Sequence, residues 1–562
     1  MSVHGSIAYD SYYYSRKKYS KTFPYYLARR DAEDPDYIYL IPQSEESIWS
    51  VSTGWDKNRK VYMEFGIDYN RTFGLHKTTA LILYNQSKYY SPSLQYYVPN
   101  AYQGLVGRLT YEYASRYLAE FNMGYNGTEN FAKGKRFGFF PAVSLGWVIS
   151  EEKFFPKNNI VKYLKVRGSY GEVGNDQIGG DRFLYLPSSY GAASDSGVNK
   201  YNFGLASNPY TSLMIVENKI GNPDLTWEKA KKMNVGVDIN LFNNCLTASF
   251  DIFKEKRNNI LANRSTSPMI IGANLPAYNF GEMENRGWEM DLNFRHHIQD
   301  FHYWARFNYS FARNEIIYMD EVQKRYDYQM TTGRRKNQFF GLIFDGYYNS
   351  WEEINALDRP KSSWSGNQLQ PGDVKYVDVN QDGVIDDYDM VPIGYTPVPE
   401  IIYGFSFGAQ YKGFDFSILF QGADNVSIKY FGRSMWPFAK GEESAKSLIK
   451  ERWTQERYEA GEKITFPRLS LNPNGETDHN YRPSTLWIRD ASYLRLKNLE
   501  VGYTFTGGFV KRLNLNSVRL YFNGSNLFTW TDVVDLDPEA PSRSGNPPGT
   551  CDRVGHGRLP LL

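Results

Sequence analysis

The chain has 562 residues, with 64 Lys and Arg against 62 Asp and Glu, so its formal net charge is only +2. This balance argues against a protein that binds nucleic acid through electrostatics. Aromatic residues make up 17% of the chain, yet the mean hydropathy is −0.56. No stretch approaches the roughly 20 apolar residues of a membrane helix, whereas a transmembrane β-barrel needs only strands that alternate apolar and polar residues.

The start of the chain has the features of a strand. The residues after Met1 show neither the basic n-region nor the apolar h-region of a secretory leader. If the protein acts outside the cytoplasm, we expect its true start to lie upstream. Cys245 and Cys551 are too few for a disulfide scaffold and lack metal-ligand spacing, and whether they pair with each other stays open.

In chain order, the dominant pattern is alternation with a period of two. In residues 61–70, apolar side chains at every second position alternate with Glu64, Asp68 and Asn70. The pattern recurs in residues 105–113, 117–126, 233–241, 246–253, 288–295, 303–311, 403–411 and 414–421. Regular strands of roughly ten residues fit a strand that spans a bilayer better than the five or six residues of a soluble sheet.

The connections alternate in length. Short joints are expected at 114–116, 242–245, 296–300 and 412–413, and long ones at 84–102, 174–226, 257–284, 314–400 and 423–491. In an up-and-down barrel this places all short turns at one rim and all long loops at the other, as in outer-membrane barrels. About fifteen strands are predicted, from one near Val3 to one near 518–528. Bacterial single-chain barrels have even strand numbers, so this odd count does not close an ordinary barrel.

Secreted β-sandwiches and propellers also contain alternating strands joined by turns. Propellers repeat at a fixed period, which this chain lacks, and soluble sandwiches rarely need strands of ten residues. The pattern therefore favours a membrane barrel. The polar residues Glu64, Asp68, Arg108, Glu120 and Asp238 are assigned to its lumen by alternation, and their mixed charge indicates no preference for an anionic or a cationic cargo.

One segment has the spacing of a loop that binds a hard cation. Between residues 378 and 389, oxygen donors stand at loop positions 1, 3, 5, 9 and 12, Gly383 stands at position 6 and a backbone carbonyl at position 7. The candidate ligands are Asp378, Asn380, Asp382, Val384, Asp386 and Asp389. The expected ion is Ca²⁺, with Mg²⁺ as the alternative, in a structural role within a long loop. Asp389 replaces the usual Glu, so bidentate capping by this residue is less certain; an acidic surface turn is the competing interpretation.

Other polar clusters carry weaker signals. His296, His297 and His302 surround one turn, but neighbours on a strand point to opposite faces, so at most two converge and rim histidines are the preferred interpretation. Aromatic pairs such as 347–348, together with 12–14, 89–90 and 96–97, are interpreted as a membrane-interface girdle rather than as stacking platforms for sugars. No nucleotide-binding loop, nucleophile elbow or zinc-protease motif occurs, so no enzyme is predicted.

Several phrases resemble the SusC/RagA family of TonB-linked outer-membrane transporters. They are YLKVRGSYGEVGN at 163–175, NPDLTWE at 222–228, ENRGWE at 284–289, GDVKYVDVN at 372–380, SYLRLKNLEVGY at 492–503 and NGSNLFT at 523–529. The resemblance follows the order of the family over most of the chain, to about residue 544, and the loop at 378–389 matches an acidic segment of the family.

The resemblance implies a 22-stranded barrel with an N-terminal plug in the outer membrane of a Gram-negative cell. Such proteins import large nutrients, oligosaccharides or peptides, with energy from the TonB–ExbB–ExbD complex and with a SusD-like surface lipoprotein over the mouth. The expected contacts are therefore these proteins, outer-membrane lipid and the nutrient, with no nucleic acid. The competing hypothesis is a secreted calcium-binding β-protein that binds or acts on glycans.

The chain departs from the family pattern at both ends. The signal peptide, the segment that contacts TonB, the plug and roughly six strands are expected upstream of this sequence. At the other end, residues 546–562 contain paired prolines and several glycines and cannot alternate as a final strand. We expect residues 1–545 to form a partial, C-terminal barrel of an all-β, antiparallel up-and-down transmembrane fold without a plug, and 546–562 to be an aberrant tail from a frameshifted reading frame.

Overall fold

The computed structural model covers the whole chain, and the description below is confined to defined parts of it. The described residues are 1–24, 26–30, 34, 38–42, 44–177, 182–187, 191–192, 200–205, 210–213, 215–216, 220–266, 275–364, 369–432, 436–438, 447–470 and 478–539. The final segment, 540–562, which includes Cys551 and the expected aberrant tail, lies outside them.

One large antiparallel sheet of 15 strands dominates the molecule, and each strand pairs with its neighbour in the main order of the chain. The strands are β1 (Ser2–Ser20), β4 (Ser50–Phe73), β5 (His76–Tyr90), β6 (Asn100–Tyr113), β7 (Tyr117–Thr128), β8 (Phe137–Val148), β9 (Val161–Asn175), β14 (Glu228–Leu241), β15 (Leu246–Ala262), β16 (Tyr278–Ile298), β17 (Phe301–Tyr318), β24 (Ile401–Tyr411), β25 (Phe414–Asp424), β28 (Tyr493–Phe505) and β29 (Val518–Thr531). The predicted all-β, up-and-down arrangement of about fifteen strands is confirmed.

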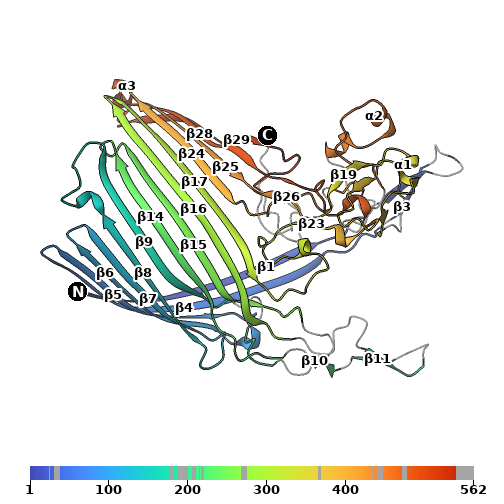
Figure 1. Cartoon of the computed structure of the whole chain (residues 1–562), viewed down its shortest axis with the longest axis horizontal. Coiled ribbons are helices and arrows are strands. Elements are labelled where there is room, and N and C mark those ends of the chain that lie inside the picture. Colours follow the sequence, from blue (N-terminus) through green and yellow to red (C-terminus); the bar gives the residue numbers. More distant parts are fainter. Residues whose placement is uncertain are drawn as a thin grey trace.

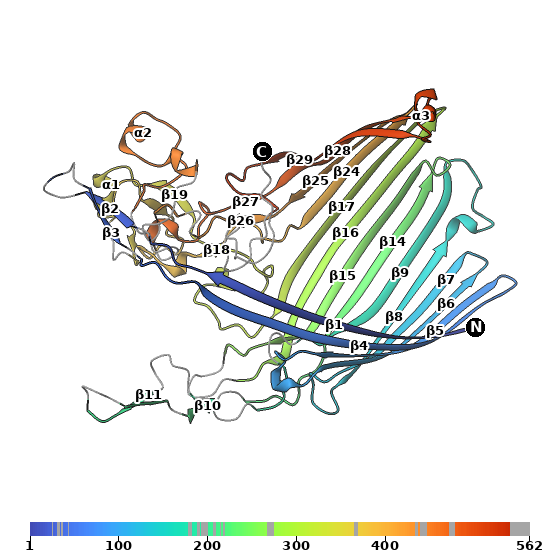
Figure 2. The same cartoon turned by 180° about the vertical axis from the view of Figure 1, so that it is seen from behind.

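The sheet is strongly curved, with short turns gathered at one end and long connections at the other (Figure 1). The short helix α3 (Gly508–Arg512) lies in the turn between β28 and β29 at the short-turn end. Seen from behind, β1 and β4 run along one side of the curved sheet while β28 and β29 lie at the other (Figure 2). Among the described residues, no helix is both long enough and apolar enough to cross a membrane.

The strands run further than the sequence predicts at the long-loop end. The connection expected at 84–102 shrinks to 91–99, and the one expected at 257–284 shrinks to 263–277. The added segments lack the regular apolar alternation, and cross-strand ion pairs such as Lys254 with Glu284, at 2.9 Å, accompany the continued ladder. Loss of apolar alternation therefore marks the end of the lipid-facing part of a strand and not the end of the strand.

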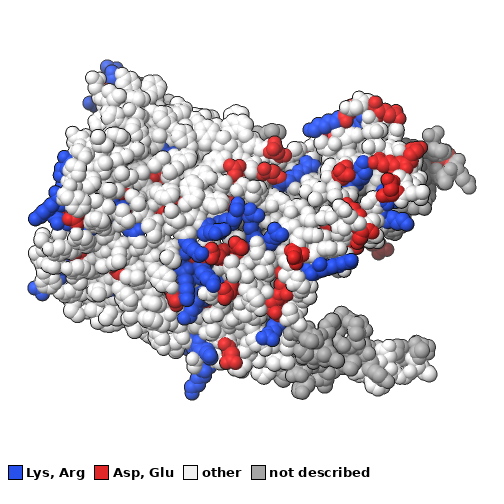
Figure 3. All heavy atoms as spheres, viewed as in Figure 1, with Lys and Arg blue, Asp and Glu red and all other residues white. Residues whose placement is uncertain are grey.

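The two faces of the sheet differ in chemistry. An apolar row crosses four neighbouring strands through Val237, Phe250, Met290 and Tyr309. The alternate positions hold Asp238 and Asp251, which point to the other face because successive strand residues alternate. In the space-filling view the outer surface over the middle of β14–β17 is almost free of charged side chains, which gather instead at the long-loop ends of these strands (Figure 3). The outer face thus suits lipid, and the inner face suits water.

The two longest described connections contain the main hydrophobic core. It includes the fully buried Trp487, Tyr430, Phe466, Leu342 and Val374, drawn from the segments that follow β17 and β25. Short pairs of strands form within each segment. After β17 they are β18 (Phe340–Gly341) with β23 (Val391–Pro392), β19 (Phe344–Tyr347) with β21 (Val374–Tyr376) and β20 (Lys361–Ser362) with β22 (Val384–Ile385), and after β25 the pair is β26 (Ser427–Lys429) with β27 (Ile488–Asp490). We call this folded unit, together with α1 (Trp351–Asn355) and α2 (Gln455–Glu459), the loop body.

Shorter pairs complete the described structure. They are β2 (Tyr26–Arg30) with β3 (Ile38–Pro42) between β1 and β4, and β10 (Gly191–Ala192) with β13 (Ile215–Val216) and β11 (Lys200–Phe203) with β12 (Tyr210–Leu213) between β9 and β14. All of them belong to connections at the long-loop end. The periodic sequence of the barrel strands gives no indication of these pairs.

The chemistry of the two faces predicts different tolerance to charge. Replacement of Phe250 with Lys places an ammonium group in the middle of the apolar row and is expected to cost about 2–4 kcal/mol of stability. Asn293→Lys on the inner face of β16 is the matched control and is expected to change stability by less than about 1 kcal/mol. The measurement is unfolding of the full chain in detergent, followed by heat-modifiable gel mobility; equal losses for the two variants would contradict the face assignment.

Candidate functional site

The inner wall of the sheet holds linked charges of both signs. Arg167 of β9 forms ion pairs with Asp238 of β14, at 3.1 Å, and with Asp251 of β15, at 2.6 Å. Ser249 donates a hydrogen bond to Asp238 at 2.9 Å. One guanidinium therefore joins three consecutive strands, because its planar fork can reach two carboxylates at once.

The same wall continues toward β6 and β7. Arg108 donates to Glu120 at 2.9 Å, and Asn122 donates to the same carboxylate oxygen at 2.9 Å. A cavity of about 510 Å³ lies along this wall, lined by Glu120, Lys165, Arg167 and Asn234 among others. The lumen thus offers both donors and acceptors, as the alternation of the sequence predicts.

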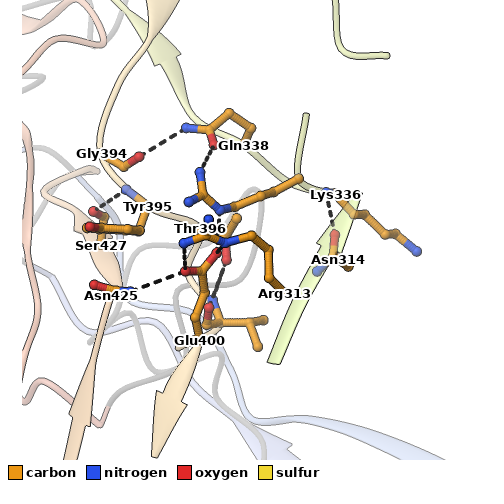
Figure 4. Close-up of polar contacts among 12 residues, drawn as sticks. Arg313, Asn314, Lys336, Gln338, Gly394, Tyr395, Thr396, Glu400, Asn425 and Ser427 are labelled. Carbon is orange, nitrogen blue, oxygen red and sulfur yellow. Dashed lines mark hydrogen bonds and ion pairs between the residues drawn. The ribbon is translucent and has the colours of Figure 1, made fainter. Parts of the chain in front are cut away.

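A buried carboxylate attaches the loop body to the barrel rim. Glu400, whose side chain is 4% exposed, immediately precedes β24 and accepts hydrogen bonds from Arg313 of β17 at 3.0 and 2.8 Å. Arg335 and Asn425 also donate to Glu400 (Figure 4). Since Arg335 and Glu400 belong to the connection between β17 and β24, and Asn425 follows β25, this one side chain joins two connections to the barrel strand β17. We call these four residues the Glu400 clamp.

The charge state of the clamp follows from its contacts. Burial alone would raise the pKa of Glu400, but the hydrogen bonds from Arg313 and Arg335 outweigh burial and hold the pKa below its usual range. Gln338 extends the network, since it accepts from Arg335 at 3.3 Å and donates to the carbonyl oxygen of Gly394 at 3.2 Å. Both ends of the segment between β17 and β24 are therefore tied to the same carboxylate.

A second buried network joins the two halves of the loop body. Asp373 accepts a hydrogen bond from Asn480 at 2.8 Å and lies 2.6 Å from Arg468. The side-chain oxygen of Asn480 accepts a hydrogen bond from the backbone N–H of Val374 at 2.9 Å, and its backbone carbonyl oxygen accepts one from the indole N–H of Trp487 at 2.8 Å. Polar groups buried in this way are stable only when each is paired, so the network fixes how the two connections pack.

Close packing in the loop body also sets local backbone requirements. Gly372 has a positive φ of 92°, and a Cβ atom there would lie 2.5 Å from the ring of Trp453. The indole of Trp453 donates to Asn349 at 3.1 Å. A glycine is therefore required at position 372 for both conformation and space.

The predicted cation loop forms a compact turn between β21 and β23. Asp378 accepts a hydrogen bond from the N–H of Gly383 at 2.8 Å, and Asp382 accepts from the N–H of Val384 at 3.0 Å. Gly383 adopts a positive φ of 81°, as the sharp bend requires. The other Asp378 oxygen, Oδ1, is buried and has no hydrogen-bond partner. A buried carboxylate oxygen without a partner, in a loop of this spacing, has the chemistry of a ligand for a hard cation.

The last position of the loop has a different role. Both oxygens of Asp389 accept backbone N–H groups, from Val379 at 2.8 Å and from Asp386 at 2.9 Å. Burial, and to a smaller extent the charge of Asp378, raises the pKa of Asp389. Asp389 therefore closes the loop through hydrogen bonds. Within the described ranges, no group of three or more His, Cys, Asp or Glu side chains is arranged to hold a metal, so the carboxylates of this loop do not converge on one point in this structure.

The three histidines near the turn between β16 and β17 do not share one face of the sheet. His297 and His302 are paired across β16 and β17, with ring centroids 5.5 Å apart, whereas His296 occupies the alternate face and contacts Cys245. The expected limit of two converging histidines agrees with this register.

The girdle interpretation is wrong for Tyr347 and Tyr348. These side chains are 8% and 7% exposed and belong to the cores of the loop body. A pair of tyrosines at a loop end has the same sequence signature in a folded loop as at a membrane interface. The clamp residues Arg313, Arg335 and Glu400 were also missed, because their contacts connect positions far apart in the sequence.

This architecture defines a large outer-membrane β-barrel with a polar lumen and a folded extracellular loop body. The chain belongs to the family described as "TonB dependent receptor-like, beta-barrel", whose model matches residues 3–527. The family assignment confirms the predicted SusC/RagA type and the outer-membrane location. It is a family of receptors and transporters, not of enzymes, and it does not favour the competing hypothesis of a secreted calcium-binding β-protein that binds or acts on glycans.

Two curated relatives show how much of such a protein the chain spans. TonB-dependent receptor P3 of Formosa agariphila is 28% identical over 459 residues, which cover 80% of this chain and 43% of the relative. TonB-dependent receptor SusC of Bacteroides thetaiotaomicron is 28% identical over 453 residues, which cover 80% of this chain and 42% of the relative. The chain thus spans less than half the length of these relatives.

Solved structures agree with the fold. The RagAB peptide importer in its closed-closed state superposes with a TM-score of 0.68 at 19% identity, covering 95% of this chain and 57% of that chain. The structure of the RagAB peptide transporter gives a TM-score of 0.65 at 21% identity, covering 86% of this chain and 53% of that chain.

The Glu400 clamp predicts a pH-dependent contribution to stability. Because the folded pKa of Glu400 lies below its unfolded value near 4.5, the stabilisation is fully present above that value and is lost as the pH falls through the folded pKa. Glu400→Gln is expected to lower stability by about 1–2 kcal/mol at pH 7, with a smaller difference from the parent at pH 3.5.

Urea unfolding of the full chain in detergent at both pH values measures this difference. Glu315→Gln is the matched control, since Glu315 lies on β17, the strand of Arg313, without an ion pair or a side-chain hydrogen bond to any described residue. A loss at pH 7 that stays constant at pH 3.5 would rule out the ionised clamp.

Proposed function

We propose that the chain forms the barrel of a TonB-coupled importer of large polar nutrients, oligosaccharides or peptides. The observation that carries the proposal is the inner wall, where Arg167 links Asp238 and Asp251 across three strands below a folded loop body. A wet wall with donors and acceptors of both signs can exchange hydrogen bonds with sugar hydroxyls or peptide groups. The family membership and the names of the relatives support transport.

The proposed partners follow from the same arrangement. A SusD-like surface lipoprotein caps the mouth and docks on the loop body, which is the largest folded surface at the extracellular end. The TonB–ExbB–ExbD complex supplies energy, and this coupling is assigned to parts that the relatives have outside the matched region. RagAB, a solved peptide importer with the same fold, supports a two-component assembly.

The transport proposal is tested in the native bacterium with the gene in its own locus. Deletion of the gene is expected to abolish uptake of either a fluorescent heptasaccharide or a fluorescent ten-residue peptide, to the level of a strain without TonB. Reintroduction of the full gene is the control. Uptake of both solutes at the parental rate in the deletion strain, or uptake that persists without TonB, would refute the proposal.

We further propose that residues 378–389 bind Ca²⁺, or Mg²⁺ as the alternative, in a structural role. The carboxylates of Asp378, Asp382 and Asp386, the Asn380 side chain and the Val384 carbonyl supply the oxygens, while Asp389 closes the loop. The buried, unpartnered Asp378 Oδ1 supports this assignment. A bound cation neutralises the crowded carboxylates. It also holds the segment in place where its own strand β22 pairs with β20.

Metal binding is measured on the full chain in detergent by titration calorimetry and by thermal unfolding with and without a chelator. We expect Ca²⁺ to raise the unfolding temperature by several degrees in the parent, and Asp378→Asn to abolish this rise. Asp387→Asn removes the same charge from an exposed, non-ligand position and should retain it. A parent protein whose unfolding is insensitive to both Ca²⁺ and chelator would disprove the site.

A further inference from the structure

A belt of basic residues borders the lipid-facing surface at the long-loop end. On the outer face, Ile252, Trp288 and Phe311 form the last apolar row across β15, β16 and β17. The next outward row of the same strands holds Lys254, Arg286 and Arg313, and Lys229, Lys231 and Lys256 lie one or two rows further. These six cations form the basic belt, and the space-filling view shows a gathering of basic side chains, mixed with acidic ones, near its centre (Figure 3).

The register of the belt places like charges directly opposite each other. Lys254 faces Arg286, Arg286 faces Arg313, and Lys231 faces Lys256. Such pairs lie about 5 Å apart at Cβ and destabilise a sheet unless an anion compensates them. The strand pairing in the rows of the basic belt therefore does not favour the stability of the sheet.

Acidic residues compensate the belt only in part. Glu284 pairs with Lys254 and Glu282 with Lys256, each at 2.9 Å, while Glu172 lies within 4 Å of both Lys229 and Lys231. Arg313 is held by Glu400 in the clamp, so it adds less free charge to the belt than the other five cations. The Glu284 side chain is 19% exposed against 54% for Lys254, so the ammonium groups project beyond the carboxylates. Arg286 is exposed and forms no ion pair with any residue that the structure describes.

We propose that the basic belt binds the phosphate groups of lipid in the outer leaflet of the membrane. The belt directly follows the last apolar row on the outer face of the same three strands. A lipid whose acyl chains lie against Phe250 and Ile252 therefore has its headgroup at Arg286. Trp288, stacked on Tyr309 at 4.7 Å, lies at the level between acyl chains and headgroups where amphipathic rings accumulate. Arg and Lys near an anionic membrane surface gain affinity from each phosphate they approach.

The proposal is tested on the full chain in dodecylmaltoside micelles by native mass spectrometry. The probes are diphosphoryl lipid A and the same lipid after removal of its phosphates, with inorganic phosphate as a competitor. The parent is expected to bind the diphosphoryl form at least 10-fold more tightly than the dephosphorylated form. Removal of three cations in Lys231→Gln/Lys254→Gln/Arg286→Gln is expected to weaken binding by about 100-fold, from roughly 5-fold per cation.

Matched variants separate the belt from general charge and folding effects. Lys153→Gln/Lys162→Gln/Lys412→Gln removes three cations at the short-turn rim and should leave binding within 2-fold of the parent. Lys231→Arg/Lys254→Arg/Arg286→Lys keeps the charges and should also bind as the parent does, which maintains the test if the neutral variant fails to fold.

Three results would overturn the proposal. The first is equal affinity of the parent for both forms of the lipid. The second is equal loss of binding when cations are removed at either rim. The third is a fall in oligomer mass, without any change in lipid binding, when the belt is neutralised, which would assign this face to contact with a second copy of the chain.

Discussion

The backbone ladder between neighbouring strands is the constraint on which the rest of the structure depends. In lipid no water is present to satisfy a free N–H or carbonyl group, so each strand must pair along its whole length. Pairing fixes the register, and register fixes which side chains face lipid and which face the lumen. The row from Val237 to Tyr309 and the Arg167 network are two consequences of the same ladder.

The sequence predicts what the ladder controls. Alternation in residues 61–70 or 403–411 is local, and both segments lie within strands of the sheet. Strand ends are predicted poorly, because Glu282 and Glu284 fall in the connection expected at 257–284, although both lie in β16 and form cross-strand ion pairs with β15. The hydropathy of a strand depends on what its outer face contacts. That face contacts lipid along the middle of the strand and water near its long-loop end, before the strand itself ends.

The loop body follows different rules, and its structure could not be predicted from periodicity. Trp487 packs against Phe466 and Tyr481, and its indole is held by Asn480, whose side chain contacts residues more than 100 positions away. The candidate cation loop could be predicted from the sequence because its oxygen donors lie within 12 residues. The sequence did not predict that Asp389 accepts backbone N–H groups and so closes the loop. Local spacing can reveal a site, but long-range contacts decide how each residue serves it.

The shared core of the loop body has a mechanical consequence. The segments after β17 and β25 share one set of buried side chains, and Glu400 anchors both at the barrel rim. Neither segment can leave the mouth while the other stays. Separation would expose Trp487 and would remove the Asn480 and Arg468 partners of the buried Asp373 carboxylate. The two connections are therefore bound into a single unit, and a displacement of either one at the mouth has to carry the other with it.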